Sequence, residues 1–375
     1  MRILLSLLIG CILVIQPLAA QQLSQNEQSL IESNSYYYLY RDNSKVDGFL
    51  QWLQDSKKLD QSHRVQNYPV GFLAVVFAEN PNQLQGWILN HTFTGNIKET
   101  IEKALWLSGN SKMITALFGE IPGYTRSTAP SLLSLKLTRA EDLDMMWGAF
   151  SASGNVAYVN KVIDVLDDKF PLTGDESMDK LTRDAAAWSL GSNMRQHELV
   201  DRLIHKELTV RSDLVKKKLQ TIVERYGKRN PFPNQDGEFS AILIITNNKN
   251  LEEHTKPSTD VIKVKEISEI KAGDDLAIKI AFTGMQLTDD LKADVTFDLQ
   301  IISPNGKIIE GADFKNLEAL KTRVPSRFRI FDNKNFIMIG FDSMDELGTY
   351  KILANVYDNI GNKKILLMKE IKFVN

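Results

Sequence analysis

The strongest constraint in this sequence is a change of hydrophobic period near residue 230. Before this point apolar side chains recur every three or four positions, as on one face of an α-helix. After it they alternate with polar side chains, as in a half-buried β-strand. The stretch Arg229–Gly237 holds two prolines, a glycine and short polar residues, which interrupt regular structure. We therefore expect a helical domain over residues 21–230, a linker over 231–238 and a β-domain over 239–375.

The helical part is organised around residues 143–166, which predict two short helices joined by a tight turn. One apolar stripe with helical spacing ends at Phe150, and a second begins at Val156. Gly154 and Asn155 lie between them, and both residue types tolerate the left-handed conformation in which many helices end. Two helices this short cannot bury their apolar faces alone, so the chain should contain more units of this kind.

Three other stretches share the pattern of an aromatic-bearing helix, a small turn and a second apolar helix. The four turn asparagines are Asn80, Asn110, Asn155 and Asn193, so the separations are 30, 45 and 38 residues. These periods lie in the range of helical-hairpin repeats, which stack into a solenoid with a shared core. We expect a solenoid-like α-helical hairpin-repeat domain, and an irregular helical bundle is the alternative.

The C-terminal part contains eight short stretches with the period of a β-strand. They are Phe239–Thr246, Val261–Ile267, Leu276–Phe282, Val295–Ile302, Phe328–Phe331, Phe336–Phe341, Tyr350–Tyr357 and Lys364–Val374. Turn sequences rich in Asn, Asp and Gly separate several of them. Short strands at this regular spacing are typical of a β-sandwich.

The last strands of this domain resemble those of immunoglobulin-like domains. Gly348-Thr349-Tyr350 precedes an alternating apolar run. In the immunoglobulin-like family a tyrosine at the start of the penultimate strand hydrogen-bonds back to the preceding corner, and Tyr350 stands at that place. Ile352 stands where antibody domains have a cysteine, so the resemblance is to the cysteine-free bacterial kind. The whole layout is also similar to uncharacterised exported proteins of Gram-negative bacteria, which implies location and fold only.

The N-terminus has the features of a secretory signal peptide. Met1-Arg2 supplies a positive charge, Ile3–Ile15 is mostly apolar, and Leu18-Ala19-Ala20 offers small residues for cleavage after Ala20. Cleavage there would leave no transmembrane span and predicts a periplasmic or secreted protein. Leu8-Ile9-Gly10-Cys11 also resembles a bacterial lipobox, but apolar residues on both sides of Cys11 disfavour a lipoprotein.

Cysteine content and charge narrow the classes of function. Cys11 is the only cysteine, so the mature chain would contain none. It could use neither a thiol nucleophile nor a cysteine-ligated zinc ion, and a cysteine-free exported protein suits a bacterial periplasm. The formal net charge of −2 at pH 7 gives no overall attraction to nucleic acid or to membranes.

Two stretches are candidate binding surfaces. Tyr36 and Tyr40 lie in a dense aromatic run, and on one helix they would share a face. That face is either part of the core or an aromatic groove for a ligand or peptide. Lys216, Lys217 and Lys218 lie in a segment where basic residues outnumber acidic ones. Such a helix could contact anionic lipid, polysaccharide or an acidic protein, or it could be a solvated capping helix.

No familiar catalytic or metal-binding motif occurs. The segment from His197 to Asp201 has Asp where a zinc-peptidase helix needs its second His. His205 lies more than two helical turns from His197, too far to share one ion. The two Ser-x-x-Lys matches have no companion motif, and neither a phosphate-binding loop nor a dinucleotide fingerprint is present. We therefore expect no cofactor and no metal.

These observations favour an exported binding or scaffold protein whose partner is a protein or an envelope polymer. The alternative is a hydrolase or lyase that acts on envelope polymers with carboxylates from separated helices, because such a site needs no local motif. A deep pocket with converging ionisable groups would favour the enzyme, and a shallow aromatic surface would favour the binding protein. A third hypothesis is a structural envelope protein that uses a sandwich edge for strand addition. The sequence gives no indication of oligomeric state.

Overall fold

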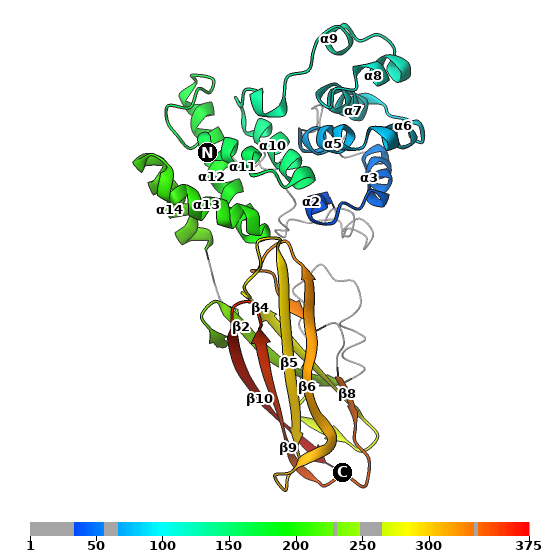
Figure 1. The fold of residues 1–375 in the computed structure, drawn as a ribbon, viewed down its shortest axis with the longest axis vertical. Coiled ribbons are helices and arrows are strands. Elements are labelled where there is room, and N and C mark those ends of the chain that lie inside the picture. The colour runs from blue at the N-terminus through cyan, green and yellow to red at the C-terminus, as the bar shows by residue number, and fades with distance from the viewer. Residues whose placement is uncertain (1–33, 56–66, 228–230, 248–264, 334–336, 375) are drawn as a thin grey trace, which may run out of the picture. The chain divides into compact units, whose positions relative to one another are not determined.

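A computed structural model describes residues 34–55, 67–227, 231–247, 265–333 and 337–374 (Figure 1). The predicted signal peptide and the lipobox lie outside the described residues. The chain divides into two compact units, Met1–Gly227 and Lys228–Asn375, which we call the helical unit and the sandwich unit. None of the described helices has both the length and the apolar run needed to cross a lipid bilayer.

The described residues of the helical unit form twelve α-helices and one 3-10 helix. They are α2 (Tyr37–Tyr40), α3 (Ser44–Asp55), α5 (Asn67–Glu79), α6 (Pro81–Leu89), α7 (Gly95–Leu107), α8 (Ser111–Phe118), α9 (Pro122–Thr125), η1 (Leu132–Ser134), α10 (Ala140–Ser153), α11 (Val156–Asp164), α12 (Glu176–Gln196), α13 (Glu198–Val210) and α14 (Asp213–Tyr226).

Three of the four predicted turns join two helices as expected. Asn80 and Asn110 directly precede α6 and α8. Gly154 ends α10 with a φ of 69°, in the left-handed region that glycine adopts at low cost. The side chain of Asn155 accepts a hydrogen bond from the backbone N–H of Ala157 at 3.0 Å and thereby caps α11. These turns are encoded locally, by residues that satisfy the helix ends.

The fourth predicted turn, at Asn193, is wrong. α12 continues to Gln196, and the chain breaks only at His197. Asn193 is buried, and its Nδ2 donates a hydrogen bond to the carbonyl oxygen of Ser189 at 2.9 Å, within the helix. A Cβ at Gly191 would lie 2.2 Å from the Tyr226 ring of α14. The glycine therefore permits close helix packing and does not form a turn.

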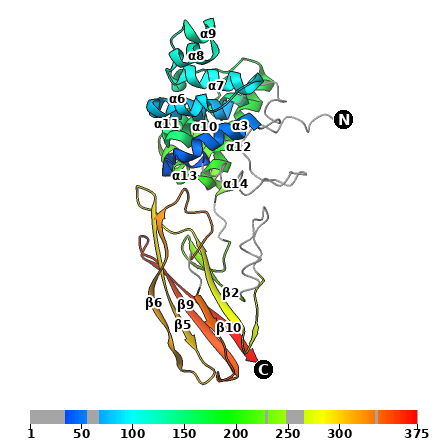
Figure 2. The same cartoon turned by 90° about the vertical axis from the view of Figure 1, so that its right-hand side faces the viewer.

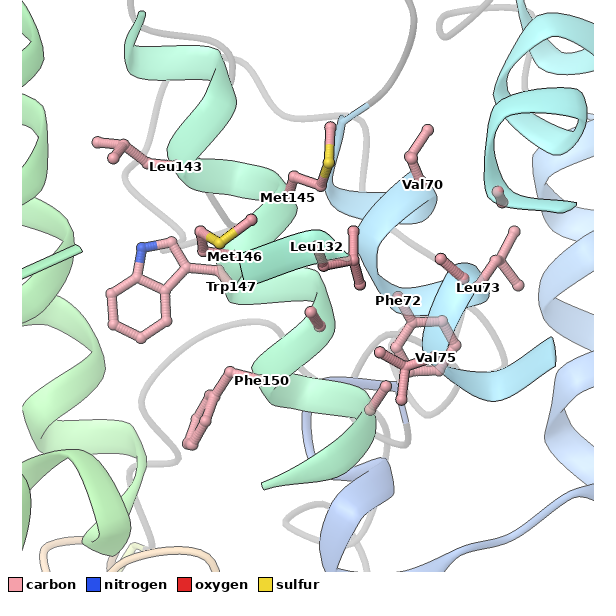
Figure 3. Close-up of a cluster of buried hydrophobic side chains, with 14 of the residues drawn as sticks. Val70, Phe72, Leu73, Val75, Leu132, Leu143, Met145, Met146, Trp147 and Phe150 are labelled. Carbon is pink, nitrogen blue, oxygen red and sulfur yellow. The ribbon is translucent and has the colours of Figure 1, made fainter. Parts of the chain in front are cut away.

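The helical hairpins stack into a solenoid-like domain, but not in chain order. α5 packs against α7 and also against α10, while α12 contacts α10, α13 and α14. A Cβ at Gly71 of α5 would lie 1.9 Å from the carbonyl oxygen of Met145, and one at Gly148 of α10 would lie 2.1 Å from that of Tyr68. These glycines let α5 and α10 approach closely. Residues 69–77 of α5 are all buried, and Figure 3 shows Val70, Phe72, Leu73 and Val75 of this helix beside α10.

The described residues of the sandwich unit form ten strands. They are β1 (Asn234–Asp236), β2 (Phe239–Asn247), β3 (Glu269–Lys271), β4 (Asp275–Thr283), β5 (Lys292–Ile302), β6 (Ile308–Arg323), β7 (Phe331–Asp332), β8 (Ile337–Gly340), β9 (Gly348–Asp358) and β10 (Lys363–Val374).

These strands form an immunoglobulin-like β-sandwich. One sheet has the order β1-β2-β4-β7, with β8 also paired to β4, and the other has the order β3-β10-β9-β5-β6. Figure 2 labels β10, β9, β5 and β6 of the second sheet. β2, β4 and the β7–β8 pair take the places of strands A, B and E, and the second sheet takes those of A′, G, F, C and C′. The hydroxyl of Tyr350 donates a hydrogen bond to the carbonyl oxygen of Glu346 at 2.8 Å, which is the expected tyrosine corner.

The strand pattern of the sequence misses β6, although it is a long strand. The register of β6 with β5 shifts at three places. Gly311 and Asn316 have positive φ angles of 79° and 51°. Such β-bulges remove the strict alternation by which a strand is recognised in a sequence.

Three smaller predictions also need correction. Most of the predicted strand Val261–Ile267 lies outside the described residues, and its described end is not a strand, because β3 begins at Glu269. The predicted strand Phe328–Phe331 is reduced to β7, which contains only Phe331 and Asp332. β1 lies within the predicted linker, where it pairs with β2.

Candidate functional site

The two predicted tyrosines do not share a surface. α2 has four residues and ends at Arg41, which adopts the left-handed conformation. Tyr36 precedes this helix and is 7% exposed, whereas Tyr40 is 54% exposed. The Tyr36 ring lies 5.0 Å from the ring of His197, so Tyr36 belongs to the interior of the helical unit.

The buried side chains of Tyr36, Phe150 and His197, together with the half-buried Tyr38, form a cluster that joins α2, α10 and the α12–α13 junction. We call it the buried cluster. The hydroxyl of Tyr38 lies 3.3 Å from Nδ1 of His197, and the Phe150 ring lies 5.1 Å from the His197 ring. Burial raises the pKa of the Tyr38 phenol well above its usual range, and the nearby Glu198 carboxylate adds to this shift. His197 and Glu198 are both buried, so this cluster lies in the interior of the helical unit.

Carboxylates from separated helices do approach this interior region. Burial raises the pKa of Tyr68 to about 12, and the charge of Asp144 on α10 contributes to the shift. Glu198 on α13 is 0% exposed and accepts a hydrogen bond from Nε of Arg202 at 3.2 Å. Asp144 is 6% exposed. Each of these two carboxylates thus lies near a different tyrosine, and both are buried.

The two histidines of the zinc-like segment lie in different environments. His197 is buried, while the side chain of His205 is 47% exposed and its Nδ1 lies 2.9 Å from the carbonyl oxygen of Asp201. In the part of the chain that the structure describes, no three His, Cys, Asp or Glu side chains are arranged to hold a metal ion.

An open surface pocket of about 320 Å³ lies on the helical unit, between α11, η1 and the segment that follows α11. Its lining residues are Leu133, Ala157, Asn160, Lys161, Asp164 and Phe170. The four from α11 follow the spacing i, i+3, i+4 and i+7, so they share one helical face. The sequence analysis missed this face, because it followed only the apolar stripe of the same helix.

Two cations hold the α11 side of the pocket in place. Nζ of Lys161 donates hydrogen bonds to the carbonyl oxygens of Leu133 and Leu135, which ties η1 and the following residue to α11. Arg211, at the end of α13, pairs with Oδ1 of Asp164 and donates a hydrogen bond to Oδ1 of Asn160 at 3.2 Å. These contacts fix the orientation of the polar lining side chains.

Two further cations hold the segment that carries Phe170. Nζ of Lys218 donates hydrogen bonds to the carbonyl oxygen of Leu166 at 2.8 Å and to Oδ1 of Asp168 at 2.7 Å. Arg183 donates to the carbonyl oxygens of Asp168 and Phe170 at 3.2 and 3.3 Å. The hydrogen bond from Lys218 lowers the pKa of Asp168.

The three predicted lysines of α14 thus differ in role. Lys218 is half-buried and supports the pocket segment, Lys216 is half-buried, and Lys217 is exposed. Tyr36 is buried, so it does not form an exposed binding surface with these lysines. Lys218 is the one that contacts the segment leading to Phe170.

The polar side chains of the pocket retain hydrogen-bonding capacity. Within the described part of the chain, neither Oδ2 of Asp164 nor Nδ2 of Asn160 takes part in a hydrogen bond. The ammonium group of Lys161 has three donors, of which two carbonyl oxygens take two. Burial lowers the pKa of Lys161, and the carboxylate of Asp164 opposes this shift.

The edge strand β6 bears on the hypothesis of strand addition. It lies at the end of its sheet and carries register shifts against β5. The side chains of Lys315 and Lys321 are 55% and 64% exposed. Bulges and lysines are features that hinder pairing with another strand, so β6 is not suited to strand addition.

No known family model matches this chain, and no curated protein matches it. Among solved structures, the alkylpurine DNA glycosylase AlkC of Pseudomonas fluorescens is 12% identical over 82% of this chain and 75% of that chain, with a TM-score of 0.21. An immunoglobulin-like protein of Pseudomonas aeruginosa is 14% identical over 37% of this chain and 94% of that chain, with a TM-score of 0.18. A family 123 glycoside hydrolase of Clostridium perfringens is 15% identical over 36% of this chain and 27% of that chain, with a TM-score of 0.22.

Proposed function

We propose that this protein is an exported, non-enzymatic binding protein that holds a protein or envelope-polymer partner through the pocket on α11. Export to the periplasm or beyond rests on the signal-peptide features of residues 1–20. The resemblance of the layout to uncharacterised exported proteins of Gram-negative bacteria supports the same location.

The lining of the pocket is the observation that carries this proposal. Hydrolysis of a glycosidic bond commonly needs two carboxyl groups about 5 to 9.5 Å apart across that bond. Among the described lining residues, Asp164 alone carries a carboxyl group. The pocket therefore offers polar groups that can orient a ligand, together with Leu133 and Phe170 as apolar walls, which is the composition of a binding site.

One observation supports the alternative, an envelope-polymer hydrolase or lyase. Asp144 and Glu198 come from different helices and lie near Tyr68 and Tyr38. Both carboxylates are buried, so a polymer would reach them only if the buried cluster opened. The binding function requires no such rearrangement.

A sedimentation experiment separates the two functions. The mature protein is incubated with purified peptidoglycan, with capsular polysaccharide on beads and with immobilised envelope proteins, and both the bound protein and any released fragments are measured. We expect retention on one of these materials without release of fragments. Release of fragments that Glu198→Gln abolishes would establish the enzyme instead, and retention on none of the materials would overturn the binding function.

A further inference from the structure

We infer that the pocket on α11 binds a neutral sugar unit, with the sugar ring against Phe170 and its hydroxyl groups on Asn160, Lys161 and Asp164. This inference rests on the proposed binding function and names the chemical class of its ligand. The pocket volume of about 320 Å³ lies at the lower end of the range of about 300–1,000 Å³ for small-molecule sites. It has room for one unit, and its open side lets a longer glycan continue beyond it.

The apolar wall fits the face of a sugar ring. Phe170 and Leu133 line the pocket from outside α11, and the four α11 residues line it from the helix. Aromatic rings offer a flat apolar face that packs against the C–H groups of such a ring, while polar neighbours bind its edge. Arg183 holds the backbone of Phe170, so this wall is in place before the ligand arrives.

The hydrogen-bonding groups of the pocket that no described residue occupies fit hydroxyl groups. Asp164 Oδ2 accepts, Asn160 Nδ2 donates, and the third N–H of Lys161 donates. A hydroxyl group both donates and accepts hydrogen bonds. Neighbouring hydroxyl groups of one sugar can therefore pair with the donors of Asn160 and Lys161 and with the acceptor of Asp164.

The charge balance selects a neutral ligand. Lys161 and Asp164 are the two ionisable side chains among the described lining residues, and their charges are opposite. Arg211, which lies beside them, pairs with both Asp164 and Glu207. Phosphate and sulfate groups are usually bound by an excess of cations, and this site has no such excess.

The walls are fixed before binding, which favours affinity. Lys161, Arg211, Lys218 and Arg183 hold the lining segments through hydrogen bonds and ion pairs within the protein. A ligand that enters a preorganised site loses less free energy in ordering the protein.

The test is isothermal titration of the mature protein with neutral trisaccharides of glucose, mannose, galactose and N-acetylglucosamine. A heparin fragment and inorganic phosphate serve as anionic probes. Ala157→Phe places a ring in the pocket without removing any polar contact and should weaken sugar binding at least tenfold. Ala116→Phe adds the same ring on α8, where Ala116 is exposed, and should leave binding unchanged. Phe170→Leu should weaken binding as well, and thermal melts of each variant show that the fold is retained.

The outcomes distinguish the ligand class from the binding function. A neutral sugar that binds the parent protein and Ala116→Phe, but not Ala157→Phe, supports the inference. If no neutral sugar binds but Ala157→Phe still removes retention on an envelope material, the ligand class is wrong and the binding function stands. Sugar binding that survives in Ala157→Phe, or heparin binding that the same variant removes, overturns the sugar site. If the parent protein is retained on none of the envelope materials, the proposed function itself is overturned.

Discussion

Among the described residues of the helical unit, Trp147 is the largest fully buried side chain, and its role is structural. It is 1% exposed and projects from the side of α10 that faces away from the α5 residues Phe72 and Leu73 (Figure 3). Trp106 and Trp188, which also lie shortly before predicted turns, are only half-buried. Three tryptophans at similar places before predicted turns thus have different surroundings, which their local sequence does not reveal.

Truncation of Trp147 should therefore destabilise the helical unit strongly. Trp147→Ala removes a buried ring and leaves a cavity, at a cost of about 3–5 kcal/mol. The melting temperature should fall by at least about 6 °C, since 1 kcal/mol moves a domain of this size by about 2–4 °C. Trp188→Ala is the control and should shift the melt less. A shift below about 2 °C for Trp147→Ala would reject the core assignment.

Gly154 combines a left-handed conformation with a close contact, and a second glycine separates the two effects. Gly109 also has a positive φ, of 81°, but a Cβ there would meet no atom within 4 Å. A Cβ at Gly154 would lie 2.9 Å from the ring of Tyr38. Both substitutions by alanine should cost about 1–2 kcal/mol for the backbone. Gly154→Ala should cost about 1–3 kcal/mol more than Gly109→Ala, because of the contact with the Tyr38 ring. Urea unfolding measures the difference, and equal midpoints for the two variants would rule out this contact.

Ionisation of the Tyr68 phenol should lower the stability of the helical unit at alkaline pH. Its folded pKa of about 12 exceeds the value of about 10 in an unfolded chain. Because the fold favours the neutral phenol, the stabilisation is complete below about pH 10 and is lost as the pH rises towards about 12. Tyr68→Phe cannot ionise, so its melting temperature should fall less steeply over this pH range. Parallel pH profiles for the two proteins would contradict the assignment.

At the scale of elements, the segment after α11 shows how a distant helix fixes a local structure. Residues 165–170 are held by Lys218 of α14 and by Arg183 of α12. The sequence indicates that α14 is basic, but not that one of its lysines faces inward. The role of Lys218 depends on where α14 packs, which neither helix encodes alone.

Loss of Lys218 should loosen this segment. Lys218→Met keeps much of the apolar stem but removes the hydrogen bonds to Leu166 and Asp168, so amide hydrogen exchange over residues 166–172 should accelerate. Lys217→Met, at the exposed neighbouring position, should leave exchange unchanged. Equal exchange in both variants would show that Lys218 does not hold the segment.

At the scale of the whole molecule, the change of period near residue 230 coincides with the division into two compact units. Prolines and a glycine interrupt regular structure in this part of the sequence, so we expect proteases to cut there first. Trypsin should cut first at Lys228 or Arg229. The chain enters β1 shortly after them, and pairing with β2 protects that strand from cleavage. Mass spectrometry should find one helical and one β fragment, and first cuts inside either unit would contradict the boundary.

Local features of the sequence determined the class of each unit. Gly154 and Asn155 end and start helices through their own backbone preferences, and the alternation before Asp358 specifies β9. Tyr350 completes its corner with a residue four positions away. Such features depend on a few neighbouring residues, so they can be predicted from the sequence.

The tertiary structure alone decided which elements meet. The packing of α10 against α5, the contact of Gly191 with Tyr226 and the bulged path of β6 all depend on surfaces supplied by distant segments. The pocket is of the same kind, because Asn160 and Asp164 from α11 meet Phe170 only after cations from α12, α13 and α14 fix the walls. Helical period shows that a face is apolar or polar, but the partner of that face is chosen by shape and charge over the whole chain.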